Sequence, residues 1–258
     1  MVKSLLLKMI GSHGYELHRK DGRSSFAGVL RHAKKMGVNP AEVIDVGAAH
    51  GRFTEICSRI FPNAGYLLIE PLKEYTPYLD KVCSKLSRSR HILIAAASRS
   101  GEMTLNVHPD LVGSSFYRED EDSDVNGVPR SVSTAPLDDL VKNAGALSPY
   151  LLKVDVQGSE LDVLYGAGET LKNTELLILE ASFLSFFAGA PIFYDVIAHM
   201  KSRGFVVYDI FGLSHRPLDG ALAQADIAFV KEDSPLRADH HYATGEQRRA
   251  LTRRLRTR

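Results

Sequence analysis

The sequence predicts an α/β protein, a three-layer sandwich in which helices cover both faces of a mostly parallel seven-stranded sheet. Apolar runs of strand length alternate with segments of helical periodicity, and this alternation is typical of βαβ units. The chain has 258 residues, of which 44% are hydrophobic and 24% are charged, a composition that supports one globular domain with a sizeable core. The last strand has no crossover helix before it, so we expect it to run antiparallel to its neighbour.

Each predicted strand is an apolar run of four to six residues, and each predicted helix has apolar residues at helical spacing. The strands are expected at residues 43–46, 65–69, 92–96, 151–156, 175–180, 205–210 and 226–230. The helices are expected at residues 25–36, 53–60, 73–86, 137–144, 160–167 and 193–203. Residues 212–224 contain two glycines and a proline and show little helical periodicity, so they predict a loop or hairpin between the last two strands.

The sandwich is expected to comprise residues 25–232, which include an acidic loop, and to be flanked by an N-terminal extension and a basic tail. Residues 1–24 form an N-terminal extension, whose short apolar run is interrupted by a lysine and cannot span a membrane. Residues 108–130 combine an acidic run with glycine and proline breaks, which predicts a long loop, either a solvated excursion or a lid over the substrate. Residues 233–258 form a basic tail. No signal peptide is recognisable, so a cytoplasmic location is expected.

Charge and cysteine content exclude several classes of protein. The net charge is +1, so the chain as a whole has no broad attraction for nucleic acid. Residues 246–258 nevertheless hold six arginines and one glutamate. A basic tail of this kind contacts nucleic acid, an anionic membrane or a partner, or simply stays solvated. Cys57 and Cys83 each stand alone in the sequence, which excludes a disulfide framework and a four-cysteine zinc site.

A glycine-bearing turn follows the first predicted strand. The spacing Asp-x-Gly-x-x-x-Gly occurs at Asp45, Gly47 and Gly51, and Glu70 closes the next apolar run. Glycine lets the backbone approach a ligand closely, and the helix that follows aims free N–H groups at the same ligand. A carboxylate at the tip of the neighbouring strand is placed to accept both hydroxyls of a ribose. The expected cofactor contacts are Asp45, Gly47, Ala48, His50, Gly51, Glu70, Ala96 and Asp155.

Dinucleotide-binding folds begin with the same order of strand, glycine turn, helix and acidic residue. Their fingerprint requires glycine at positions 47, 49 and 52, whereas this sequence has Gly47, Ala49 and Arg52. The pyrophosphate turn is therefore not supported, and the observed spacing suits a cofactor without phosphates. Together with Glu70, the spacing indicates a site for S-adenosylmethionine. His50 fits a cofactor contact and an exposed turn equally well.

A second polar motif follows the fourth predicted strand. Residues 150–167 form a buried strand that presents Asp155 at its end and then opens a helix at Gly158. In open α/β sheets, ligands bind beyond the carboxyl ends of the strands. Asp155 should therefore face the same crevice as Asp45 and Glu70.

On these motifs the chain resembles the FkbM-type methyltransferases, over roughly residues 26–231. The matching motifs are Val-Ile-Asp-Val-Gly-Ala-Ala-His-Gly-Arg-Phe-Thr at 43–54, Ile-Glu-Pro at 69–71, Pro-Leu-Asp-Asp-Leu at 136–140, Leu-Lys-Val-Asp-Val-Gln-Gly-Ser-Glu at 152–160 and Leu-Ile-Leu-Glu at 177–180. The resemblance implies the Rossmann-like class I methyltransferase fold with its seven strands, S-adenosylmethionine as donor, and O-methylation of a sugar or another small hydroxylated product. His50 and Ser159 depart from the asparagine and the aromatic residue that are common in the family, which leaves the acceptor open.

Methyl transfer to a hydroxyl needs aligned reactants and a group that removes the hydroxyl proton or stabilises the alkoxide. The candidate catalytic residues are Asp155, Glu180 and His215. Asp155 and Glu180 end adjacent predicted strands, so they are placed to share one proton or a divalent cation such as Mg²⁺. The sequence identifies no metal ligands. His215 lies in a loop after the sixth predicted strand, where an exposed histidine is the simpler interpretation.

Three functions are compatible with these features. The first is transfer of a methyl group from S-adenosylmethionine to a small hydroxylated acceptor. The second is methylation of RNA or another nucleic acid with help from the arginine tail, although the rest of the chain is slightly acidic and lacks an Asn-Pro-Pro-Tyr-like motif. The third is a non-catalytic adenosyl-binding domain. A homo-oligomer is compatible with all three.

Overall fold

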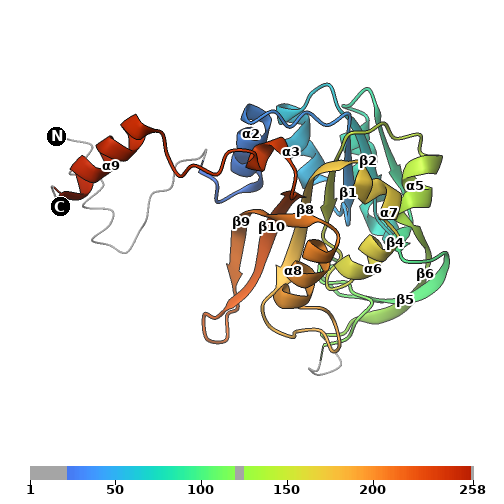
Figure 1. The fold of residues 1–258 in the computed structure, drawn as a ribbon. Coiled ribbons are helices and arrows are strands. Elements are labelled where there is room, and N and C mark those ends of the chain that lie inside the picture. The colour runs from blue at the N-terminus through green and yellow to red at the C-terminus, as the bar shows by residue number, and fades with distance from the viewer. Residues whose placement is uncertain (1–21, 120–124, 257–258) are drawn as a thin grey trace, which may run out of the picture.

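The computed structural model, which describes residues 22–119 and 125–256, confirms the predicted α/β fold (Figure 1). Its main sheet has seven strands in the order β3-β2-β1-β7-β8-β10-β9. These strands are β1 (Glu42–Val46), β2 (Gly65–Ile69), β3 (Ser89–Ile92), β7 (Tyr150–Val154), β8 (Thr174–Ser182), β9 (Phe205–His215) and β10 (Leu222–Lys231). Neighbouring strands are parallel except where β10 pairs with β8 and β9. The last strand therefore runs antiparallel, as the sequence predicts.

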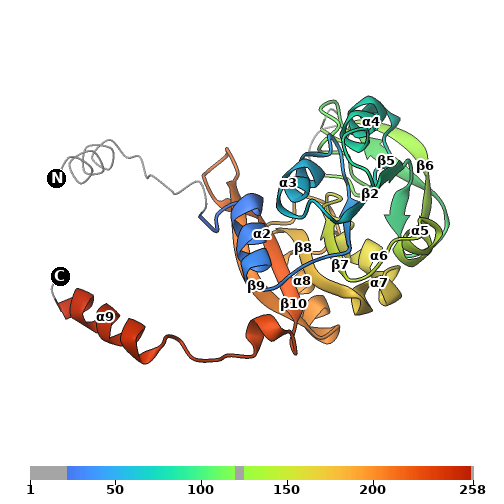
Figure 2. The same ribbon diagram turned by 90° about the horizontal axis from the view of Figure 1, so that it is seen from above.

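Helices cover both faces of the main sheet and bury two apolar cores (Figure 2). One face carries α2 (Phe26–Lys35), α3 (Arg52–Ile60) and α4 (Thr76–Cys83), and the other carries α5 (Leu137–Asn143), α6 (Glu160–Tyr165), α7 (Gly168–Lys172) and α8 (Phe193–Ser202). Every residue of β1, β2 and β7 is buried. Strands that are apolar on both faces need helices on both sides, and this requirement produces the three layers.

A second sheet of three strands, in the order β4-β6-β5, was not predicted from the sequence. Its strands are β4 (Ala95–Ala97), β5 (Gly101–Val107) and β6 (Val128–Pro136). The single strand predicted at 92–96 is therefore wrong, because its first residue ends β3 and its last two belong to β4, in different sheets. Leu93, which is 45% exposed, begins the passage between the two sheets. Hydrophobicity marks an apolar run but does not say which strand it pairs with.

The connections around the sheets are shorter than expected. β9 and β10 extend as a hairpin, so that only residues 216–221 separate them and the hairpin interpretation of 212–224 is correct. The predicted loop 108–130 is shorter because its end enters β6. Asn106 holds the beginning of this loop, since its side-chain amide donates to the carbonyls of Ser115 and Tyr117 at 3.3 and 3.2 Å. The centre of the loop, 120–124, lies outside the described residues.

Two predicted helices are interrupted. The segment 73–86 begins with a 3₁₀ turn, η1 (Lys73–Tyr75), continues as α4 and leaves the helix after Cys83. Pro77 lies in the first turn of α4, where its missing N–H leaves no helical hydrogen bond unmade. The segment 160–167 ends early at Gly166, the C-cap of α6, and α7 begins directly afterwards.

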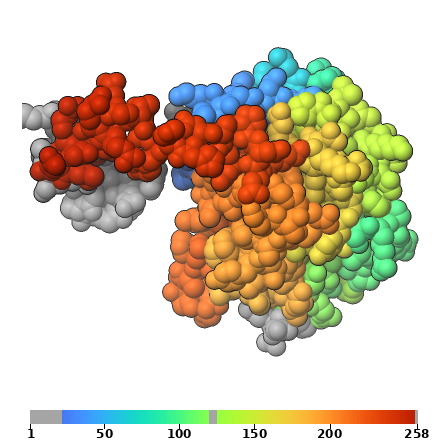
Figure 3. Space-filling view, viewed as in Figure 1, coloured from blue at the N-terminus to red at the C-terminus, as the bar shows by residue number. Residues whose placement is uncertain are grey.

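The C-terminal part contains η2 (Pro235–Arg237) and α9 (Gly245–Arg256). No residue of α9 is buried. Figure 3 shows, in red, the chain crossing the surface of the body before α9 projects beyond it. Within the described residues, no helix is long and apolar enough to cross a membrane. Most of the predicted N-terminal extension, 1–24, lies outside the described part of the chain.

Candidate functional site

A cleft opens at the carboxyl ends of the strands where the sheet order reverses, between β1 and β7. The chain proceeds from β1 outward to β2 and β3 in one direction, and to β7 and β8 in the other. The loops at such a switch point diverge and leave a crevice for a ligand. Polar lining comes from Glu70, Ser114, Asp155 and Gln157, and apolar lining comes from Ile69, Ile94, Leu105, Leu111 and Phe116.

The glycine turn after β1 forms one wall of this cleft. Gly47 has φ +72°, and a Cβ atom there would lie 1.9 Å from the carbonyl oxygen of Asp155. Its N–H donates to the carbonyl of Ile69 at 2.9 Å, which ties the turn to the end of β2. Only glycine combines this left-handed conformation with such a close approach. Glycine is therefore required at position 47 because the ends of β1, β2 and β7 pack against one another there.

Glu70 lies directly after β2 and holds the same turn from the other side. Its Oε2 accepts the N–H of Ala49 at 2.9 Å, and its Oε1 accepts the N–H of Leu72 at 3.0 Å. The side chain is buried, and burial raises the pKa of its carboxyl although both backbone donors oppose the rise. Each oxygen keeps a further lone pair, so Glu70 can also accept a ligand's hydroxyls.

Asp45 lies below the turn and does not line the cleft. Its side chain is fully buried, with Oδ2 accepting the Thr54 hydroxyl at 2.8 Å and Oδ1 lying 3.6 Å from Nζ of Lys153. The Lys153 ammonium also donates to the Gly47 carbonyl at 3.0 Å and lies 3.2 Å from Oδ2 of Asp155. Burial opposes the charge of Lys153, but the carboxylates of Asp155 and Asp45 outweigh it and raise its pKa. Lys153 therefore joins the ends of β1 and β7 beneath the cleft.

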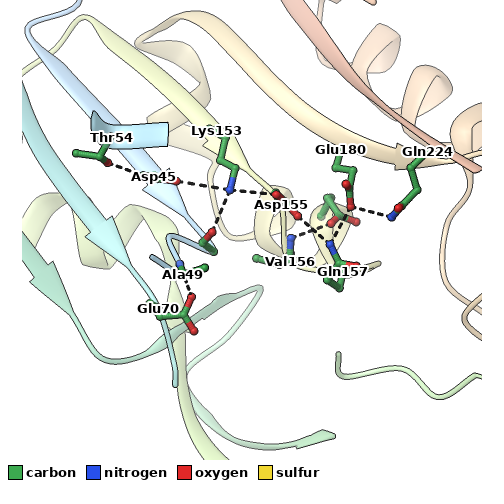
Figure 4. Close-up of polar contacts among 12 residues, drawn as sticks. Asp45, Ala49, Thr54, Glu70, Lys153, Asp155, Val156, Gln157, Glu180 and Gln224 are labelled. Atoms are coloured by element: carbon green, nitrogen blue, oxygen red, sulfur yellow. Dashed lines mark hydrogen bonds and ion pairs between the residues drawn. The ribbon is translucent and has the colours of Figure 1, made fainter. Parts of the chain in front are cut away.

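A polar network extends from the cleft along the sheet edge toward β10 (Figure 4). The side-chain amide of Gln157 donates to Oδ1 of Asp155 at 3.0 Å and to Oε2 of Glu180 at 2.9 Å. The amide of Gln224 donates to the same Glu180 oxygen at 2.9 Å. Gln157 has φ +53°, a conformation uncommon outside glycine. Its carbonyl accepts the Ser115 hydroxyl at 2.6 Å, which attaches the loop after β5 to the network.

Burial raises the pKa of Asp45 although Lys153 opposes the rise, and three further carboxyls of this region also have raised pKa values. Burial raises the pKa of Glu180 well above its ordinary value, and the negative charges of Asp155, Glu160 and Asp226 add to the effect. Burial, followed by the charge of Asp155, raises the pKa of Asp226 to about 7. Burial also raises the pKa of Glu160 to about 7, although its Oε1 accepts the N–H groups of Val156 and Gly158. Desolvation without a cationic partner favours the protonated form.

The predicted site residues divide into those that line the cleft and those that do not. Gly47, Glu70, Ala96 and Asp155 line it, whereas Asp45, Ala48, His50, Gly51, Glu180 and His215 do not. The ring of His50 packs edge-on against Tyr75 and Tyr78, with centroids 4.8 and 4.6 Å apart. His215 is exposed at the end of β9, and the structure does not bring it to Asp155 or Glu180. The roles assigned to these residues stay predictions.

The sequence did not single out Thr54, Gln157, Gln224 or Asp226 as site residues. Gln157 lies inside the Asp155 motif, so its position in the sequence indicated that it could belong to the site. Gln224 and Asp226 become neighbours of Glu180 only through the antiparallel register, in which Asp226 pairs with Glu180. In the part of the chain that the structure describes, no group of three or more His, Cys, Asp or Glu residues could hold a metal ion.

The fold and the site together define a class of protein. A seven-stranded sheet with one antiparallel strand, a glycine turn after β1 and an acidic residue after β2 is the class I methyltransferase arrangement. Residues 45–207 match the family model described as methyltransferase FkbM domain. The chain belongs to the FkbM methyltransferase family.

Comparison with individual proteins gives distant relatives. The chain is 29% identical to the 2-O-methyltransferase NoeI of Sinorhizobium fredii (strain NBRC 101917 / NGR234), over 57% of this chain and 65% of that protein. It thus matches 65% of the length of this curated relative. The crystal structure of methyltransferase FkbM from Methylobacillus flagellatus KT is 18% identical, with TM-score 0.48 over 72% of this chain and 43% of that one. TrmK of M. capricolum, solved with S-adenosyl-homocysteine, is 12% identical, with TM-score 0.47 over 83% and 70%.

Proposed function

We propose that this protein is an S-adenosylmethionine-dependent O-methyltransferase that acts on a hydroxyl of a small molecule. The observation that carries the proposal is the placement of Glu70 and Asp155 on two sides of one cleft, at the switch point of a chain of the FkbM family. Glu70 is suited to a ribose, and Asp155 to the positively charged end of the cofactor.

The cleft fits an adenosyl cofactor by its chemistry. The carboxylate of Glu70 has lone pairs left after it accepts two backbone N–H groups. The apolar residues Ile94, Leu105, Leu111 and Phe116 line the cleft and provide apolar surface on which a purine ring can pack. Asp155 and Gln157 add an acceptor and an amide at the β7 side. When bound, the cofactor supplies an electrophilic methyl group on a sulfonium.

A hydroxyl acceptor is supported by the relative named as a 2-O-methyltransferase and by the carboxyls beside the cleft. Methylation of a hydroxyl releases a proton, which the carboxylate form of Asp155, Glu180 or Asp226 can receive. The resemblance to the family makes a sugar or a glycosylated natural product our preferred acceptor. Among the described residues, no group of three or more His, Cys, Asp or Glu residues could hold Mg²⁺.

Calorimetric titration with S-adenosylhomocysteine tests the cofactor site directly. We expect one ligand per chain, and an absence of binding would refute the proposal. A screen of hydroxylated acceptors, monitored by S-adenosylhomocysteine release with and without Mg²⁺, then tests transfer. Turnover by the purified protein would exclude a non-catalytic adenosyl-binding domain.

Methylation of a nucleic acid is the second candidate, because α9 carries five arginines and buries none of its residues. Positive charge of this density attracts phosphates. Deletion of residues 246–258 separates the two candidates. If the truncated protein still methylates a small acceptor at the full rate, the arginine helix is not part of acceptor binding and the second candidate loses its support.

A further inference from the structure

The adjacent strands β7, β8 and β10 each place one carboxylate at the same level of the sheet edge. Asp155 comes directly after Val154, which pairs with Leu179 of β8, and Glu180 is the next residue of β8. Asp226 of β10 is the direct partner of Glu180. We call Asp155, Glu180 and Asp226 the carboxylate row. Its first member lines the cleft, so the row begins where the proposed methyl donor binds.

The row is short of positive charge. The ammonium of Lys153 lies within ion-pair distance of Asp155 and of the buried Asp45, and both depend on it. Among the described residues, no cation lies within 4.0 Å of Glu180 or Asp226. Glu180 and Asp226 are partly buried, and withdrawing a carboxylate from water without a cation is costly, which favours a proton at the site instead. The row therefore has room for one positive charge, whether this is a proton or part of a ligand.

The hydrogen bonds of Glu180 can form in both of its charge states. Both of its donors are amide groups, from Gln157 and Gln224, and both reach the same oxygen, Oε2. Oε2 can accept these bonds while Oε1 gains or loses a proton. Gln157 also bonds to Asp155, so a charge in the cleft acts on Glu180 through two hydrogen bonds.

Space for Asp226 is provided by Gly212, where a Cβ atom would lie 2.0 Å from Oδ2 of Asp226.

We infer that the carboxylate row exchanges charge with the methyl donor: it releases a proton when the cationic donor binds and takes up the acceptor's proton during transfer. This inference rests on the proposed function. In the transfer, the acceptor oxygen bonds to the methyl carbon, and the carbon–sulfur bond breaks with its electron pair on sulfur. The hydroxyl proton passes to the row. One positive charge is lost at sulfur and one is gained by the row, so the net charge of the site is unchanged.

The groups that face Glu180 set the conditions for a test. They are Lys153, Asp155 and Gln157 after or within β7, Glu160 on α6, and Gln224 and Asp226 on β10. Among them, Asp226 and Glu160 have pKa values near 7, and that of Glu180 is raised well above its ordinary value. At pH 8 the proton that a cation displaces is therefore expected to come mainly from Glu180.

The test compares two ligands that differ by one methyl group and one positive charge. S-adenosylmethionine and S-adenosylhomocysteine are titrated by calorimetry at pH 8, each in phosphate and in Tris, and the dependence on buffer ionisation enthalpy gives the protons released. We expect S-adenosylmethionine to release on the order of one proton more per site. Glu180→Gln should remove at least half of this difference. The control Glu175→Gln, on the exposed start of the same strand, should keep it.

Equal proton release with both ligands, or an unchanged difference in Glu180→Gln, would overturn the inference while the proposed function stands. Absence of binding by both ligands would instead overturn the proposed function. Circular dichroism establishes that each variant is folded. If Glu180→Gln is not folded, Asp226→Asn takes its place at pH 7, where loss of the Asp226 carboxyl should also reduce the difference and an unchanged difference refutes the inference.

Discussion

Substitution of Gly47 by alanine tests whether the glycine turn is required by packing as well as by ligand binding. Gly47 has φ +72°, and the added Cβ atom would lie 1.9 Å from the carbonyl oxygen of Asp155. A left-handed conformation costs an alanine about 1–2 kcal/mol, and forcing an atom into a tightly packed region costs about 1–3 kcal/mol more. We therefore expect Gly47→Ala to lower the free energy of unfolding by about 2–5 kcal/mol, measured by urea denaturation.

Gly204 provides the matched control. It has φ +77°, almost the same as Gly47, but a Cβ atom added there would meet open space, with no neighbouring atom within 4 Å. Gly204→Ala should therefore cost only the conformational part, about 1–2 kcal/mol. The difference between the two variants isolates the contact between the β1 turn and the end of β7. Equal losses of stability in both variants would refute the argument that Gly47 is required by this contact.

Three other substitutions test the surroundings of the turn. Glu70→Ala removes the acceptor of the Ala49 N–H and should weaken S-adenosylhomocysteine binding at least about tenfold; unchanged affinity in calorimetry would contradict the ribose assignment. Thr54→Ala removes the hydroxyl that donates to buried Asp45 and should cost about 1–3 kcal/mol in urea denaturation, with Thr54→Ser close to wild type. Because the pKa of Glu160 is raised to about 7 in the folded state, the wild type binds more protons folded than unfolded and should lose stability as the pH rises from about 4.5 to 7. Glu160→Gln should therefore be more stable relative to wild type at pH 8 than at pH 4; a constant difference would count against this.

The main sheet could be predicted because its strands are buried on both faces. β2 holds no charged residue, and β1 and β7 are apolar apart from Glu42, Asp45 and Lys153, so all three stand out in the sequence. The second sheet could not be predicted in the same way, because β5 and β6 include exposed residues and flank an acidic segment. The alternation of Met103, Leu105 and Val107 in β5 was the available signal.

The candidate site shows the same division between local and long-range information. Gly47, Glu70 and Asp155 lie in short motifs, and their nearness follows from the rule that parallel strands end at one edge. The position of Asp226 depends on a hairpin with register shifts between Gln224 and Asp226. A shift of one residue would turn Asp226 to the opposite face of the sheet. No pattern within the sequence of β10 fixes that register, so the position of Asp226 beside Glu180 could be seen only in the structure.

The carboxylates along this sheet edge have different kinds of partner. This difference explains how the edge can be rigid on the β1 side and change its charge on the β8 side. On the β1 side, Asp45 is held by the Thr54 hydroxyl and the Lys153 ammonium. Loss of charge there would leave a buried ammonium short of a partner, and breaking a buried ion pair in this way costs about 3–5 kcal/mol. On the β8 side, Glu180 is held by amides, which can donate both to a carboxylate and, more weakly, to the carbonyl oxygen of a carboxylic acid. A proton can therefore enter or leave at Glu180 without moving Gln157, and the geometry around Asp155 is kept through both charge states.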